Sequence, residues 1–432
     1  MNPCEARCHT RMYCPDCGRF HPADQVERDG RVYWRIDCPK GARERQASSD
    51  ARLFATFRSQ IRPEPKGFRR GWSNCLLHIT DACSLQCPIC FADAPRTGWR
   101  MSLDEVRTAA RRLKELKPYN VMLTGGEPSE HPDIVEIVRI LAREYGFRCS
   151  MLTNGVRGGT DPNFIARLKD AGLTKFSLSF DTFDPEVSEM MKGRRDLVEI
   201  KLRAAERCFA ANLNVGFVTT ACRLNLKEIP EIIRYYIAHA DKMSMYDIQV
   251  YQDDGRTVPG LESVDREEIV KTIVASGVVD GLKAEDFRIP QSVPAAGFCM
   301  DSDCLVWMYW LTRNGRAEPL QRHMDFDAFA DDLYRLKPGG YGLKWLRFFL
   351  CYLRHFGWRR LRLMRKWEGR RPSPGESLQM ITIESLMTPD RLDACRFGHC
   401  TGGVLLADGS VCPPCYYYGL RYAEDKARRN VS

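Results

Sequence analysis

The residues between about 72 and 280 alternate between short apolar runs and longer helical stretches, which limits the folds open to the chain. Six β-branched or apolar runs are typical of strands, at 75–80, 120–125, 149–154, 174–180, 214–220 and 246–252. The helical stretch after Ser102 has Glu105 three residues on, a capping-box spacing. Repeated βα units with right-handed crossovers predict an α/β protein with a partial (β/α)6 barrel. Its site would lie at the carboxyl ends of the strands.

Three cysteines follow the first expected strand in one short loop. Cys83, Cys87 and Cys90 form a C-x3-C-x2-C pattern. Three thiolates at this spacing can hold three irons of a [4Fe–4S] cluster and leave the fourth iron open to a small ligand. A zinc knuckle would need a fourth ligand close by, and His78 on the preceding strand is poorly placed for it.

This triplet, placed after a barrel strand, resembles that of the radical S-adenosylmethionine (SAM) superfamily. The resemblance implies an enzyme whose cluster, on Cys83, Cys87 and Cys90, cleaves SAM reductively to a 5′-deoxyadenosyl radical. That radical abstracts hydrogen from an unactivated carbon. The resemblance also implies that Phe91 packs near the adenine, and that a reductant such as ferredoxin or flavodoxin supplies the electron.

The second expected strand ends in Gly125-Gly126-Glu127-Pro128, which is similar to the GGEP motif of this superfamily. Glycines let the backbone approach a ligand closely, and a carboxylate accepts hydrogen bonds from an ammonium group. By resemblance the four residues bind the methionine amino group of SAM. Taken alone, the motif fits an ordinary turn equally well.

Polar residues end the remaining strands, and we expect them at the same mouth of the barrel. Candidates for holding the ribose and carboxylate of SAM are Thr153, Asn154, Ser179 and Asp181, with Thr220 and Gln249 as weaker ones. A turn at Asn154 and a helix cap at Asp181 are equally good explanations for those two residues.

Six cysteines beyond the barrel form three close pairs: Cys299 with Cys304, Cys395 with Cys400, and Cys412 with Cys415. Free buried thiols are the alternative, but clustered cysteines in a reducing compartment favour metal ligation. The pairs predict at least one auxiliary [4Fe–4S] cluster.

The tail resembles, more narrowly, the family of archaeal tetraether lipid synthases and methanogen pterin-methylating radical SAM enzymes. The matching positions are Cys400, Asp408, Gly409, Pro413, Cys415 and Tyr417. The resemblance implies one auxiliary cluster on Cys299, Cys304, Cys400 and Cys415. Cys395 and Cys412 are additional to this pattern, so the number of clusters stays open. A SPASM-type extension is the competing assignment.

The first 50 residues contain Cys14, Cys17 and, about twenty residues later, Cys38. With a short hairpin between them, these knuckles predict a zinc-ribbon or rubredoxin-like module holding a mononuclear Zn or Fe. Lys40 and Gly41 cannot supply the fourth ligand. Substitutes are Cys4, Cys8, His9 and His21, and a vestigial site without metal is the alternative.

Residues 343–367 predict a basic amphipathic helix interrupted near Gly357. Its polar face carries Lys344, Arg347, Arg354 and His355, and its apolar face carries Trp345, Phe349, Tyr352 and Phe356. The helix either packs on the barrel or lies at a membrane surface, where its cations meet anionic head groups. The second interpretation suits a hydrophobic or lipid substrate.

Composition places the chain among globular proteins, with 44% hydrophobic and 28% charged residues. No run approaches the roughly 18 to 20 apolar residues that span a bilayer, and the N-terminus lacks an apolar signal core. We therefore expect a cytoplasmic protein with, at most, peripheral membrane contact. The expected units are 1–50 (metal knuckle), 72–285 (barrel), 286–334 (first half of the auxiliary region), 335–372 (basic helix) and 373–432 (second half).

Together these features predict an enzyme that activates an sp3 C–H bond for carbon–carbon bond formation or alkylation of a lipid chain. Methylation of a pterin-like heterocycle and SPASM-type peptide maturation are the alternative reactions. The non-enzymatic alternative is an iron–sulfur or zinc protein that binds nucleic acid through its net charge of +9. No nucleic-acid-binding motif accompanies that charge, so we expect no nucleic-acid partner.

Overall fold

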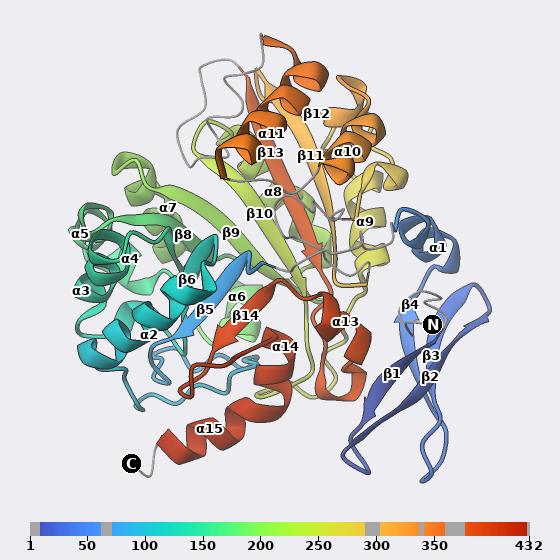
Figure 1. The fold of residues 1–432 in the computed structure, drawn as a ribbon, viewed down its shortest axis with the longest axis horizontal. Coiled ribbons are helices and arrows are strands. Elements are labelled where there is room, and N and C mark those ends of the chain that lie inside the picture. Colours follow the sequence, from blue (N-terminus) through green and yellow to red (C-terminus); the bar gives the residue numbers. More distant parts are fainter. Residues whose placement is uncertain (1–8, 62–70, 290–302, 337–340, 359–375, 430–432) are drawn as a thin grey trace.

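The computed structural model describes residues 9–61, 71–289, 303–336, 341–358 and 376–429. Within them, the strands form a four-stranded antiparallel sheet and an eleven-stranded mixed sheet (Figure 1). The described residues include no helix both long and apolar enough to cross a bilayer.

The large sheet confirms the α/β prediction. The six predicted strands are adjacent and parallel in chain order. They are β5 (Asn74–His78), β6 (Asn120–Thr124), β7 (Cys149–Thr153), β8 (Leu173–Ser179), β9 (Asn214–Ala221) and β10 (Met243–Val250). Their carboxyl ends therefore meet at one edge, as the prediction required.

Two further parallel strands flank these six. β13 (Ser377–Glu384) pairs with β10, and β14 (Gly402–Leu405) pairs with β5. Antiparallel strands continue the sheet on both sides: β11 (Leu305–Arg313) and β12 (Arg316–Pro319) beyond β13, and β15 (Val411–Cys412) beyond β14. Within the described ranges β12 and β15 are the two edges, so the barrel is open. The sequence analysis missed β13 and β14.

Helices pack on the outer face of the sheet (Figure 1). They include α2 (Leu103–Leu116), α3 (Ile134–Arg139), α4 (Val156–Thr160), α5 (Phe164–Ala171), α6 (Pro185–Lys192), α7 (Leu197–Ala210), α8 (Ile229–Ala238) and α9 (Arg266–Ala275). The expected capping box is present, since Ser102 Oγ accepts from the Glu105 N–H at 3.3 Å and the Glu105 carboxylate accepts from the Ser102 N–H at 2.7 Å. Strand alternation sends residues such as Phe217 outward into this core and leaves their neighbours facing the barrel interior.

The N-terminal sheet consists of β1 (His9–Cys14), β2 (Arg19–Arg28), β3 (Arg31–Ile36) and β4 (Arg43–Ser48), followed by α1 (Ala51–Ser59). It has a small core of its own around Met12 and Trp34. Figure 1 shows it beside α13 (Ala394–His399). The Tyr13 N–H donates to Leu392 O at 2.9 Å, so this module is fixed to the C-terminal region.

The basic amphipathic segment forms α11 (Tyr341–Phe356), which packs against α10 (Phe326–Arg335). Tyr352 and Phe356 are buried in a cluster with Phe329. Leu346 and Leu350 are 52% and 54% exposed on the same helix. One face of the helix therefore packs on the protein while Leu346 and Leu350 stay exposed. The predicted continuation to 367 falls largely outside the described residues.

Candidate active site

The three cysteines of the loop after β5 lie together at one pocket. Cys83, Cys87 and Cys90 all line it, and so do the glycines and glutamate of the GGEP turn after β6. Cys83 is buried, and Cys87 and Cys90 are half-buried. Burial raises the pKa of Cys83 and of Cys87, so both thiols stay protonated unless a cation compensates for the buried charge. The structure thus brings the two motifs to a shared site.

Backbone hydrogen bonds join the GGEP turn to the segment before Cys83. The Gly126 N–H donates to Thr80 O at 2.8 Å, and the Glu127 N–H donates to Ala82 O at 2.8 Å. A Cβ on Gly126 would lie 2.4 Å from Ala82 O. Gly125 adopts φ +152°, and a Cβ there would lie 2.2 Å from Thr80 O. Both glycines are therefore required for this close approach.

The carboxylate of Glu127 connects the ends of β6 and β7. Its Oε1 accepts from Thr153 Oγ1 at 2.6 Å and from the Ser129 N–H at 3.0 Å, and its Oε2 accepts from the Asn154 N–H at 2.6 Å. Burial raises the pKa of Glu127, and these donors oppose the increase. The side chain therefore holds the rim of the pocket in place and keeps some acceptor capacity for a ligand.

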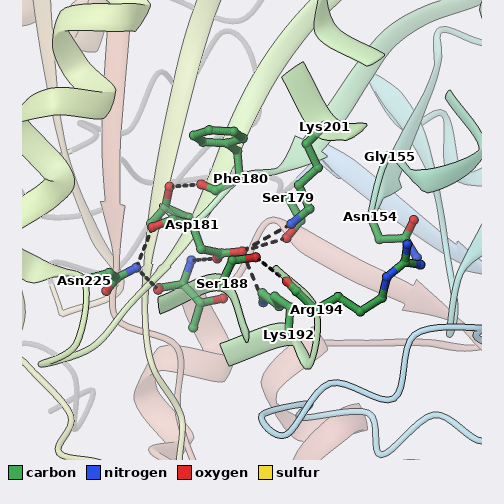
Figure 2. A network of polar contacts seen from close by, with 12 residues as sticks. Asn154, Gly155, Ser179, Phe180, Asp181, Ser188, Lys192, Arg194, Lys201 and Asn225 are labelled. Carbon is green, nitrogen blue, oxygen red and sulfur yellow. Dashed lines mark hydrogen bonds and ion pairs between the residues drawn. The ribbon is translucent and has the colours of Figure 1, made fainter. Parts of the chain in front are cut away.

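A second polar network supports the pocket behind Asp181. Figure 2 shows Lys192 and Lys201 pointing toward Asp181, with N–O distances of 3.3 Å and 3.6 Å. The Thr220 N–H also donates to Asp181 at 2.9 Å. Burial raises the pKa of Asp181, but the two lysines outweigh it and hold that pKa below 3.8. Asp181 is therefore ionised, and it orients the lysines.

Most of the residues predicted for cofactor binding line the pocket: Phe91, Gly125, Gly126, Glu127, Thr153, Asn154, Ser179, Thr220 and Gln249. Pro128 and Asp181 are outside the lining. Phe91 is 41% exposed and meets Tyr418 edge-on, with ring centroids 4.9 Å apart. Phe91 thus offers an accessible aromatic ring beside the cysteine loop.

Other pocket residues had no signal in the sequence. Lys192, at the end of α6, places a cation on the pocket wall, and Tyr251, Gln252 and Leu386 also line the pocket. Arg256 also binds the cysteine loop through two backbone hydrogen bonds. The Cys90 N–H donates to Arg256 O at 2.9 Å, and the Arg256 N–H donates to Cys90 O at 3.0 Å.

The radical SAM superfamily model matches residues 77–236. These residues are a radical SAM domain. They contain the cysteine loop, the GGEP turn and β6 to β9, so the predicted superfamily is confirmed.

Curated relatives match part of this chain and about half of their own length. The 7,8-dihydro-6-hydroxymethylpterin dimethyltransferase of Methanocaldococcus jannaschii is 28% identical over 57% of this chain and 54% of its own length. The PqqA peptide cyclase of Bradyrhizobium diazoefficiens is 30% identical over 41% of this chain and 46% of its own. The chain spans about half the length of both. The structure of Streptococcus suis SuiB bound to SAM is 16% identical, with a TM-score of 0.41 over 52% of this chain and 50% of that one.

Outside the radical SAM domain, some of the C-terminal cysteines share a neighbourhood around Arg396. Arg396 Nη2 lies 3.5 Å from Cys304 Sγ. The positive charge of Arg396 also acts to lower the pKa of Cys400 and of Cys415, against the larger effect of burial. Burial raises the pKa of Cys400 to about 11, and the neighbouring Cys415 adds to the increase. Cys299 lies outside the described residues.

Cys395 and Cys412 are the two cysteines that are additional to the resembling pattern. Cys412, on β15, has Arg421, Asp425 and Asp408 as its charged neighbours. Cys395 lies in the first turn of α13, where its N–H donates to Asp393 at 2.8 Å. The charged surroundings of Cys412 thus differ from those of Cys400 and Cys415.

The N-terminal cysteines form a compact group. Cys14 Sγ and Cys38 Sγ are 3.5 Å apart, and Cys38 Sγ and Cys17 Sγ are 3.7 Å apart. A tetrahedral site with metal–sulfur bonds of about 2.3 Å has edges of about 3.8 Å, so the three thiols fit zinc or iron. Of the proposed substitute ligands, Cys4 and Cys8 lie outside the described residues, and His21 Nε2 lies 2.9 Å from Cys17 Sγ.

Proposed function

We propose that this chain is a radical SAM enzyme, with a [4Fe–4S] cluster on Cys83, Cys87 and Cys90 and SAM in the adjoining pocket. When bound, the reduced cluster and SAM supply a 5′-deoxyadenosyl radical and free methionine by one-electron cleavage of a C–S bond. The observation that carries the proposal is the GGEP turn, hydrogen-bonded to the segment before Cys83 around one shared pocket.

The chain's own residues bind and orient SAM. The GGEP turn presents backbone oxygens and the Glu127 carboxylate to the methionine ammonium group. Lys192 offers its cation to the methionine carboxylate, and Asp181 fixes the direction of that lysine. Phe91 offers its ring to the adenine, and the hydroxyls of Ser179 and Thr220 offer hydrogen bonds to the ribose. Apolar lining residues such as Ile89 exclude water from the reacting atoms.

We further propose that the cysteines beyond the domain hold metal. Cys304, Cys400 and Cys415, with Cys299, would carry an auxiliary [4Fe–4S] cluster, and the Arg396 cation near these thiols would stabilise the negative charge of their thiolates. Cys395 and Cys412 are the ligands left for a second one. Cys14, Cys17 and Cys38 would hold a mononuclear Zn or Fe.

The reaction we favour is alkylation of a nitrogen heterocycle such as a pterin. Its support is the relative named as a dihydropterin dimethyltransferase, which matches the largest share of this chain among those described above. Alkylation of a lipid chain is the second candidate, and the exposed Leu346 and Leu350 of α11 favour it. Ferredoxin or flavodoxin is the reductant we propose for either reaction.

The activity is tested with anaerobically reconstituted protein, SAM and dithionite. We expect 5′-deoxyadenosine and methionine in equal amounts from the wild type, and neither product from Cys87→Ala. Cys208→Ala is the matched control, because Cys208 is buried in the core away from the pocket. A wild-type protein that holds a cluster but forms no 5′-deoxyadenosine would identify a non-catalytic iron–sulfur protein instead.

A further inference from the structure

Three ionisable side chains project from the inner face of the sheet below the pocket. Lys175 is on β8, Asp247 on β10 and Glu384 on β13. Each has strand neighbours, such as Phe176 and Ile383, that are fully buried in the core under the outer helices. Because side chains alternate along a strand, the three charged groups point into the barrel interior.

Contacts place these groups next to one another. Gln249 Nε2 donates to Asp247 Oδ2 at 3.1 Å and approaches Glu384 Oε2 at 3.4 Å. Thr382 Oγ1 donates to Asp247 Oδ1 at 2.5 Å. Lys175 passes over Gly216, where a Cβ would be 2.9 Å from its Cε, and reaches Met245 Sδ at 2.9 Å. Only a glycine at position 216 leaves the lysine this path.

Gln249 connects the two carboxylates to the pocket. That side chain lines the pocket and also contacts both carboxylates, so the acidic pair is one side chain away from the proposed SAM site. Lys175, Gln249 and Glu384 are half-buried although they lie inside the barrel. Glu384 is thus partly accessible and Asp247 lies buried beside it, and we call these two residues the acidic floor.

Lys175 is the cation whose charge acts on both carboxylates of the acidic floor. Its Nζ donates to Met245 Sδ at 2.9 Å rather than to either of them. Burial, with Asp247 nearby, raises the pKa of Glu384 to about 8, so this carboxyl is largely protonated at neutral pH until a hydrogen-bond donor favours its ionised form. Burial lowers the pKa of Lys175 to about 8. Charged groups inside a protein are unfavourable without partners, and such groups concentrate at functional sites.

We propose that Asp247 and Glu384 bind the N–H donor edge of an amino-substituted nitrogen heterocycle, the substrate of the radical reaction, while Lys175 binds an acceptor on its ring. This inference rests on the proposed function and names the class of substrate for it. A carboxylate accepts two parallel hydrogen bonds from adjacent N–H groups. An acyl chain offers no donor and would leave the carboxylates and the lysine unsatisfied. The acidic floor therefore favours the heterocycle over the lipid.

The test measures binding of 6-hydroxymethyl-7,8-dihydropterin to the anaerobic, SAM-loaded holoprotein by equilibrium dialysis. We expect Glu384→Gln and Asp247→Asn to raise the Kd about tenfold to hundredfold, because each weakens a charged hydrogen bond. Glu231→Gln, on the exposed face of α8, is the matched control and should bind as the wild type does. Thermal unfolding of each variant checks that it folds.

Two results would overturn the inference. One is wild-type affinity for the dihydropterin in both floor variants. The other is a wild type that does not bind the dihydropterin, whether or not it binds vesicles of dioleoylphosphatidylglycerol. The proposed function is judged separately, since Glu384→Gln should still form 5′-deoxyadenosine from SAM alone. If the wild type forms none, that function fails independently of the binding result.

Discussion

Arg429, near the end of α15 (Tyr422–Arg429), donates two hydrogen bonds to Asp81, two residues before Cys83. The distances are 3.1 Å to Oδ2 and 2.8 Å to Oδ1. The Tyr422 hydroxyl donates to the same carboxylate at 3.2 Å, and His78 Nε2 lies 2.7 Å from it. The C-terminal helix therefore fixes the start of the cysteine loop, from more than three hundred residues away.

Arg429→Met should loosen that loop. Methionine keeps an apolar stem but removes the guanidinium, which lies over the Trp99 ring and donates twice to the fully buried Asp81 carboxylate. We expect a loss of about 1–3 kcal/mol in the free energy of unfolding of the metal-free protein, measured in urea, and faster loss of iron from the reconstituted protein. Arg428→Met changes an exposed neighbour and is the control. Equal iron retention in both variants would contradict the proposed coupling.

Gly126→Ala should weaken SAM binding strongly. The added methyl would lie 2.4 Å from Ala82 O and 2.5 Å from Asp81 O, which are backbone atoms that cannot rotate away. The GGEP turn must then separate from the cysteine segment. Equilibrium dialysis with labelled SAM measures the effect, which we expect to exceed tenfold in Kd. Gly419→Ala, where the nearest atom would be 3.7 Å away, should bind SAM normally. Normal binding by both variants would show that the turn does not form the SAM site.

The ion pairs of Asp181 should make stability depend on acid pH. Its folded pKa is below 3.8, so the folded state binds fewer protons than the unfolded state, and stability falls as the pH drops through 3.8 toward the folded value. We expect Asp181→Asn to cost about 3–5 kcal/mol at pH 7, because Lys192 and Lys201 lose their partner. The difference in free energy of unfolding between Asp181→Asn and the wild type should become smaller below about pH 4. Urea unfolding of metal-free protein from pH 7 to 3 measures it, with the exposed Asp241→Asn as control. A difference in free energy of unfolding that does not change with pH would argue against an ionised Asp181.

Local patterns predicted the six barrel strands and most of the pocket, for physical reasons. Each strand is a short apolar run, and parallel strands bring their carboxyl ends to one edge. Hence Ser179, Thr220 and Gln249 could be assigned to the mouth without a structure, and all three line the pocket. Asp181 was expected there too, but the burial of its side chain places it behind the pocket wall.

What the sequence did not reveal depends on contacts between distant segments. β13 and β14 lie outside the βα repeat, so no periodicity connects them to their partners β10 and β5. Glu384 ends β13, and its place beside Gln249 follows only from the β10–β13 register. Lys192 lies at the end of a helix, where a lysine is ordinarily a solvated helix terminus. Only the three-dimensional arrangement of strands and helices shows that Glu384 and Lys192 lie at or beside the pocket.

The N-terminal knuckle should bind one metal ion that is independent of the radical SAM domain. Cys38→Ala removes a thiol whose sulfur lies within 3.7 Å of two others, so we expect it to lower zinc or iron by one ion per chain while the reductive cleavage of SAM continues. His21→Ala tests the fourth ligand. If His21 coordinates, cobalt-substituted protein should lose the tetrahedral absorption of a three-sulfur, one-nitrogen site, because water would take the open position. Arg19→Ala, at an exposed position close to this site, is the control. An unchanged cobalt spectrum in His21→Ala would assign the fourth position to another residue, and a wild type without the extra ion would mark the knuckle as vestigial.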